Sequence, residues 1–253
     1  MLREYLKSLA DKFRTYLGGE PTDLINAQDF PSAIDDVYEA GKQAGGGSGD
    51  SVMWDMVTAN GTRKNYTYSF AYWSFVDSYG NITFNLPINL KPTIVSSMFA
   101  YITNKIDLAD HLEKIGRTID FSDCTVAQQC FYTSQFTRLW KCDWSKCPNL
   151  NATYRNCSDL VTIDEIVFNE NINYNFTNTF AGCTSLQNVT ATGSLATSGL
   201  DLSECPLTRT SKLSFLNILS QTSTTKTITF GAGETLTNED VAIGTQKGWS
   251  VTV

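Results

Sequence analysis

The sequence lacks the short motifs by which many enzymes are recognised. It has a single histidine, no C-x-x-C pair, no G-x-S-x-G or H-E-x-x-H motif and no glycine-rich phosphate loop. Serine hydrolases, metalloproteases and nucleotide-binding proteins carry such motifs. The one histidine, His111, lies within DLADHLEKIG, and a lone histidine on a short helix is usually a surface residue. We therefore expect no enzymatic activity and no catalytic, metal-binding or cofactor-binding residues.

Charge and long apolar runs are scarce as well. Charged residues make up 18% of the 253 residues, and the net charge is −7. Nucleic-acid binding usually needs a basic face, so we expect no nucleic-acid partner. No apolar run approaches the roughly 18 residues of a membrane span. The opening residues, MLREYLKSLADKF, are broken by charges where a signal peptide needs roughly 7–15 apolar residues. We expect a soluble chain made in the cytosol, without membrane insertion.

Carboxylate pairs and cysteines offer little chemistry. Asp35-Asp36, Asp164-Glu165 and Glu239-Asp240 are sequential neighbours, which point apart or cap helices rather than act as an acid–base pair. The seven cysteines all lie at or beyond residue 124, are odd in number and fit neither a disulfide framework nor a zinc site. Free cysteine behaves as a small buried hydrophobe, so we predict core cysteines of a repeat.

Two helices and a linker are predicted at the N-terminus. Apolar residues at helical spacing predict a helix over 2–17, and Asp29 with Pro31 predicts a second over 31–41. The two are too small to bury a core alone. The sequence predicts a helical docking or oligomerisation module over 1–44, followed by a flexible glycine-rich linker over 45–50. The alternative is a helical hairpin packed on the rest of the chain.

The next region is predicted to cover the first repeat. Alternating apolar residues predict strands at 66–70 and 82–86, and DLADHLEKIG predicts a helix over 107–116. Stacked repeats need terminal units that shield their open edges. We therefore predict an N-terminal cap region over 51–118.

Two interleaved motifs indicate a repeat. The first is apolar-Asp-apolar-Ser-charged-Cys, in IDFSDCT (119–125), CDWSKCP (142–148) and LDLSECP (200–206). The second spaces an aromatic residue, a cysteine, a leucine and a branched residue at offsets of three, in YRNCSDLVTI (154–163) and FAGCTSLQNV (180–189). TSQFTRLWKC (133–142) is a degenerate copy in which Phe136 replaces the cysteine. Repeats of about 20–29 residues are typical of leucine-rich-repeat proteins.

The repeat gives each residue type an expected place. The leucine and the branched residue are predicted to point inward, the cysteine to sit at a tight corner, and the Asp and Ser of D-x-S to face outward. Trp140, Trp144 and Tyr154 are either core residues or aromatic platforms for a sugar. We predict a leucine-rich-repeat solenoid over 119–207.

The last segment changes pattern. A helix opening at Leu207-Thr208, a strand over 225–230, a helix capped by Thr237 and a final strand over 249–253 are predicted. This unit, 208–253, is interpreted as a C-terminal cap. The predicted fold class is α+β: a short, irregular leucine-rich-repeat solenoid with capping units, preceded by an N-terminal helical hairpin.

Three segments resemble known proteins. FAGCTSLQNV resembles the F-x-x-C-x-x-L-x-x-I repeat of BspA-like leucine-rich-repeat surface proteins. LDLSECPLT followed by LTNEDVAIGTQKGWSVTV resembles the C-terminal cap of a group of such proteins from phages and prophages of gut bacteria. INAQDFPSAIDDVYEAGK (25–42) resembles a segment that recurs at the N-termini of phage structural proteins. The chain departs from the repeat pattern in having few, uneven repeats.

The resemblance implies a virion structural protein, assembled in the host cytoplasm and exposed on a tail fibre, baseplate or other particle surface. Residues 1–44 would bind other virion proteins, and a homo-oligomer is expected. The repeat body would attach to a host-surface glycan or protein. The alternative is a bacterial cell-surface adhesion protein, which needs an export route. A virion glycan hydrolase is a third hypothesis, for which no carboxylate pair stands out.

Overall fold

The computed structural model describes the second half of the molecule and part of the region before it. The described residues are 66, 69–71, 75–76, 82, 84, 86, 89–231 and 233–253. The chain divides into two units between Ala59 and Asn60, and every described residue belongs to the second unit. The predicted module of 1–44, its two helices and the linker lie outside the described residues. Of the strands predicted at 66–70 and 82–86, the structure describes residues 66, 69–70, 82, 84 and 86, and Ser69 and Phe70 lie in a turn.

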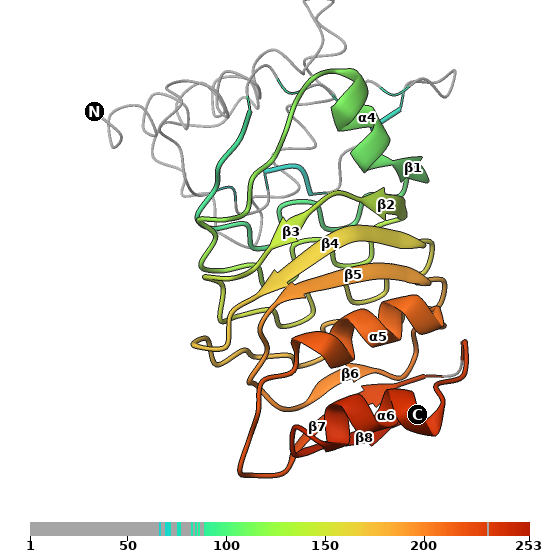
Figure 1. The fold of residues 1–253 in the computed structure, drawn as a ribbon. Coiled ribbons are helices and arrows are strands. Elements are labelled where there is room, and N and C mark those ends of the chain that lie inside the picture. The colour runs from blue at the N-terminus through green and yellow to red at the C-terminus, as the bar shows by residue number, and fades with distance from the viewer. Residues whose placement is uncertain are drawn as a thin grey trace, which may run out of the picture. The chain divides into compact units, whose positions relative to one another are not determined.

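The described part is built from short strands with three helices between them (Figure 1). In chain order they are β1 (Ile106–Asp107), α4 (Leu108–Lys114), β2 (Phe136–Leu139), β3 (Cys142–Asp143), β4 (Thr162–Phe168), β5 (Asn188–Gly193), β6 (Leu200–Leu202), α5 (Arg209–Ile218), β7 (Lys226–Phe230), α6 (Asn238–Thr245) and β8 (Trp249–Thr252).

All pairings between these strands are parallel. One sheet has the order β1-β2-β4-β3 with β5 also beside β4, and a second has the order β6-β7-β8. Thr162 of β4 pairs with Arg138 of β2 on one side and with Asn188 of β5 on the other. Outside the named strands, single parallel bridges link Val126 to Asn149 and Asn149 to Asn175. Successive passes of the chain, here called coils, therefore stack on one another (Figure 1).

A column of aromatic rings fills the interior of the stack. Each ring comes from the tight turn of a different coil, and each lies almost parallel to the next. The ring centroids are 5.1 Å apart for Phe70 and Phe99, 5.6 Å for Phe99 and Phe131, 5.5 Å for Phe131 and Tyr154, and 5.0 Å for Tyr154 and Phe180. All five residues are buried. Buried aromatic pairs add about 0.5–1.5 kcal/mol beyond the area that they remove from water, so the column stabilises each coil against its neighbour.

Beside the aromatic column runs a column of small hydrogen-bonding side chains. Each donates to the backbone carbonyl of the aromatic residue one coil earlier: Ser134 to Phe99, Cys157 to Phe131 at 2.9 Å, Cys183 to Tyr154 at 3.0 Å and Cys205 to Phe180 at 3.9 Å. A thiol suits this corner because it is small and largely apolar, yet can satisfy a buried carbonyl. The prediction of core cysteines at a corner is thus confirmed for these three, and all seven cysteines are buried.

One copy of the repeat was aligned wrongly from the sequence. The corner residue of its coil is Ser134, which follows Phe131 of the aromatic column, and not Phe136. Phe136 is a core residue at the start of β2, and Leu139 pairs with Ile163. Compared with the next coil, this coil has one residue fewer between its corner and its strand. The assumption that repeat residues always lie three positions apart therefore aligned TSQFTRLWKC out of register.

Helix α5 occupies the place beside β5 where another strand could pair. The Ser211 hydroxyl accepts a hydrogen bond from the Val189 amide at 2.9 Å and donates to the Gln187 carbonyl at 3.0 Å. The Ser214 hydroxyl accepts from the Ala191 amide at 2.9 Å. These serines satisfy backbone groups that an open strand edge would leave exposed to other chains. The five-stranded sheet therefore ends at α5 (Figure 1).

The predicted leucine-rich-repeat solenoid is wrong as a fold class. The structure consists mostly of parallel strands in two sheets that curl into a half-barrel, with few helices (Figure 1). A solenoid of that class adds one strand per coil to one continuous sheet. Here the short strands β2 and β3 both pair with β4, and the second sheet begins anew at β6. The period of the sequence is compatible with several parallel architectures, and the segments between strands decide which one forms.

Several local predictions are confirmed. The helix predicted over 107–116 is α4, which Asp107 caps by accepting a hydrogen bond from the Asp110 amide at 2.8 Å. The helix predicted to open at Leu207-Thr208 is α5, which Thr208 caps. Thr237 and Asp240 form the reciprocal hydrogen bonds of a capping box at the start of α6. Strands β7 and β8 lie where the last strands were predicted. The roles of 51–118 and 208–253 as caps remain predictions.

Candidate binding surface

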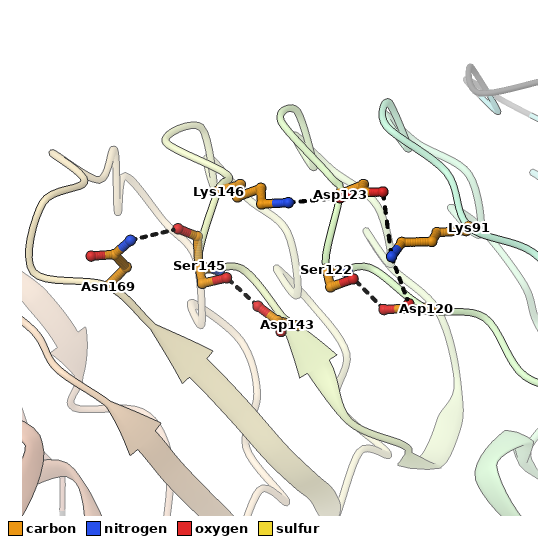
Figure 2. Close-up of polar contacts among 8 residues, drawn as sticks. All are labelled: Lys91, Asp120, Ser122, Asp123, Asp143, Ser145, Lys146 and Asn169. Carbon is orange, nitrogen blue, oxygen red and sulfur yellow. Dashed lines mark hydrogen bonds and ion pairs between the residues drawn. The ribbon is translucent and has the colours of Figure 1, made fainter.

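The D-x-S motif has a structural role in turns. The Asp120 carboxylate accepts a hydrogen bond from the Ser122 amide at 2.9 Å, and Asp143 accepts one from the Ser145 amide at 3.0 Å (Figure 2). The same bond recurs in LDLSECP at 2.9 Å. An aspartate that binds the backbone two residues on stabilises a turn. The residue between Asp and Ser is buried in each copy, which confirms the predicted alternation.

Charged side chains in and beside these turns neutralise one another. The Lys91 ammonium lies 3.3 Å from the Asp120 carboxylate and 3.4 Å from that of Asp123 (Figure 2). Lys146, one coil further on, donates to Asp123 at 2.7 Å, and this bond lowers the pKa of the Asp123 carboxyl. Asn169 continues the row by donating to the Ser145 carbonyl at 3.2 Å. These groups hold neighbouring coils together and do not form an open acidic cluster.

The aromatic residues considered as sugar platforms belong to the core. Trp144 and Tyr154 are fully buried, and the indole N–H of Trp144 donates to the Tyr154 hydroxyl at 2.9 Å. Trp140 is half-buried, and its indole donates to the Ile119 carbonyl while its ring stacks on Phe121 at 5.6 Å. Core packing is therefore the role of all three.

His111 and the carboxylate pairs are tied to structural partners. His111 is half-buried on α4, and its Nε2 atom is hydrogen-bonded to the Phe84 carbonyl. Glu165 is bound by the Thr192 hydroxyl at 2.7 Å and by Lys141 at 3.0 Å, and these hydrogen bonds lower the pKa of its carboxyl. The Asp35-Asp36 pair lies outside the described residues.

The Glu239-Asp240 pair belongs to the start of α6. Two hydrogen bonds from the Arg209 guanidinium, at 2.8 and 2.7 Å, hold the pKa of Asp240 at about 2. Because Asp240 also closes the capping box, this ion pair links α5 to α6.

Several of the buried thiols are held in their protonated form. Burial raises the pKa of Cys142 and of Cys157 to about 12. A hydrogen bond with the Cys124 thiol, together with burial, raises the pKa of Cys147. The thiolate is the form that attacks substrates and binds metals, so these groups are poor nucleophiles. Among the residues that the structure describes, no group of three or more His, Cys, Asp or Glu side chains could hold a metal ion.

An arginine between two carboxylates marks the outer face of the first sheet. Arg138 of β2 donates two hydrogen bonds to Asp164 of β4, from Nε at 2.8 Å and from Nη2 at 2.9 Å. Its Nη1 atom lies 3.9 Å from Asp107. Such bidentate pairs fix both side chains in one geometry. Asp164 therefore presents its carboxylate at a defined position on this face.

An open groove lies next to Asp164, over β4, β5 and the start of α5. Its volume is about 550 Å³. The residues that line it are Thr162, Ile163, Asp164, Asn188, Val189, Thr190, Thr208, Thr210, Ser211, Ser214 and Glu234. These three elements are adjacent in the stack (Figure 1). The groove exists because a helix, which is thicker than a strand, follows β5 in the stack.

Polar side chains in the groove point to solvent. Thr162, Asn188, Thr190 and Thr210 are exposed or half-buried. Within the described part of the chain, no hydrogen bond joins their side chains to another residue. The two serines of α5 are already bonded to the β5 backbone. The groove thus offers one amide and three hydroxyl groups that a ligand could engage.

Sequence reasoning missed this groove. In TIDE (162–165) and NVT (188–190), polar residues alternate with the buried Ile163 and Val189. This alternation could have predicted that Thr162, Asp164, Asn188 and Thr190 face outward. Nothing in the sequence placed α5 beside β5.

Two further findings concern identity and membranes. No helix among the described residues is long and apolar enough to cross a membrane. Comparison with family models, with curated proteins and with solved structures finds no match to this chain.

Proposed function

We propose that this chain is a structural protein of a phage particle that attaches to the host surface through the groove over β4, β5 and α5. The observation that carries the proposal is the set of unbonded polar groups in that groove, held on a rigid stack of hydrogen-bonded coils. Binding sites placed on strands and helices are held more firmly than sites on loops.

The rest of the proposal is supported by sequence. The segment 25–42 resembles the leader of phage structural proteins, and GGGSG (45–49) separates it from the body as a flexible linker would. In this proposal residues 1–44 bind other virion proteins, and the parallel-strand body faces outward. The bonded carboxylates and protonated thiols described above favour a binding role over catalysis.

Two measurements test the proposal. Mass spectrometry of purified particles should detect the protein, and its absence would refute the assignment to a virion. Purified full-length protein should bind the cells on which the particle grows. Thr190→Arg, which places a long side chain in the groove, should abolish that binding. Thr225→Arg makes the same change at an exposed threonine outside the groove and should leave binding intact. Detection of the protein on uninfected cells would instead favour a bacterial adhesion protein.

A further inference from the structure

We infer that the ligand of the groove is an uncharged glycan, an inference that rests on the proposed function and narrows it. The proposed function admits a protein or a glycan as the host receptor. Three properties of the groove distinguish these ligands: the hydrogen-bonding groups it offers, the apolar surface around it and its charge.

The first property is the type of polar group. Threonine hydroxyls and asparagine amides can each donate and accept hydrogen bonds. The hydroxyls of a sugar also do both, so Thr162, Asn188 and Thr190 can bind neighbouring hydroxyls of one ring without a fixed direction of donation. Asp164 adds a carboxylate that only accepts, and Arg138 fixes its orientation through two hydrogen bonds. The groove can therefore satisfy several hydroxyl groups of a bound sugar at once.

The second property is the shortage of exposed apolar surface. Protein–protein interfaces depend on a core enriched in aromatic and other large apolar side chains. Among the described residues, the only exposed large apolar side chains are Ile82 and Val253, and neither lines the groove. Ile163 and Val189, which do line it, are buried in the sheet. A protein partner would find no apolar anchor here, whereas a polyhydroxylated ligand needs none.

The third property is charge. Two carboxylates, Asp164 and Glu234, line the groove, and no lysine or arginine does. Glu234 accepts a hydrogen bond from the Arg209 amide at 2.7 Å, which holds it at the start of α5. Arg138 is already bound to Asp164, so an acidic group of a ligand finds no free cation in the lining and would lie beside two carboxylates. Glycans that carry carboxylate, phosphate or sulfate groups are therefore disfavoured, and uncharged ones are selected.

Competition on whole cells tests the inference. The purified full-length protein is bound to cells on which the particle grows, in the presence of neutral or acidic polysaccharide fractions extracted from those cells. The neutral fraction should compete, and periodate treatment, which destroys vicinal diols, should abolish binding. Asn188→Ala and Thr162→Ala should each weaken binding about threefold to tenfold, as expected for one lost hydrogen bond. Thr225→Ala is the matched control and should leave binding unchanged.

The outcomes separate this inference from the function on which it rests. Binding that survives periodate and is lost after protease treatment would identify a protein receptor and overturn the inference, while the proposed attachment function would stand. Competition by the acidic fraction alone would also overturn it. Failure of the wild-type protein to bind the cells at all would refute the proposed function itself.

Discussion

Removing one oxygen atom from the centre of the aromatic column should destabilise the protein measurably. Tyr154 is fully buried between Phe131 and Phe180, and its hydroxyl accepts the indole N–H of Trp144 at 2.9 Å. Tyr154→Phe keeps both ring contacts but leaves that N–H without its partner in the core. A buried donor that loses its only partner costs about 1–3 kcal/mol.

Tyr154→Ala provides the scale for this loss. It removes the ring as well, and truncation of a large buried aromatic side chain costs about 3–5 kcal/mol. The hydroxyl should thus account for a substantial part, but not all, of the contribution of Tyr154 to the free energy of unfolding. Combining Tyr154→Phe with Trp144→Phe removes the stranded N–H and should cost less than the sum of the two single changes, because both partners are then apolar.

The assay is urea unfolding of the full-length chain, followed by far-ultraviolet circular dichroism so that loss of a tryptophan does not alter the signal. Tyr132→Phe, at a half-buried position, is the matched control and should change the free energy of unfolding by less than about 0.5 kcal/mol. If Tyr154→Phe were as stable as wild type, or as unstable as Tyr154→Ala, the assignment of a separate energetic role to the Trp144–Tyr154 hydrogen bond would be incorrect.

Three further predictions follow from contacts elsewhere in the fold. The seven buried thiols should resist alkylation by iodoacetamide in the native protein and react in urea, as counted by intact-mass spectrometry, and rapid native labelling would contradict their burial. Asp240 has a folded pKa of about 2, below the roughly 3.9 of an unfolded aspartate, so its ionised form stabilises the fold above about pH 4 and this contribution is lost as the pH falls toward 2. Asp240→Asn should therefore melt at a lower temperature than wild type at pH 7. The difference between the two melting temperatures should shrink as the pH falls from about 4 toward 2. Ser211→Ala removes the hydroxyl that accepts from the Val189 amide and should cost about 1–3 kcal/mol in urea unfolding, whereas Thr210→Ala, next to it and exposed, should be close to neutral.

The candidate site could be predicted only in part. Thr162 and Asp164 stand at alternate positions of a strand-forming segment, so the sequence could place both on the outer face of β4. The bidentate bond from Arg138 depends on parallel pairing of β2 with β4, which are separated by a full coil. The groove itself depends on α5 lying against β5, and no local pattern in either segment specifies that contact.

Local structure was determined by the sequence. The capping residues Asp107, Thr208 and Thr237 mark three helix starts, because the side chain that binds the first free amides of a helix lies within a few residues of them. The corner cysteines Cys157 and Cys183 were recognisable for a similar reason, because each lies three residues after its aromatic residue, within one turn. These are interactions over short distances along the chain.

The fold class and the register of each coil were decided only by tertiary structure. The period of the repeat indicates that parallel segments stack, but it does not distinguish a leucine-rich-repeat solenoid from the curled, two-sheet half-barrel that forms. The coil that leads into β2 has one residue fewer between its corner and its strand than the next coil. Its corner is therefore Ser134 and not the expected Phe136, because Phe131 keeps its place in the aromatic column. Ring stacking and intercoil hydrogen bonds act between residues more than twenty positions apart, and their geometry exists only once neighbouring coils have packed.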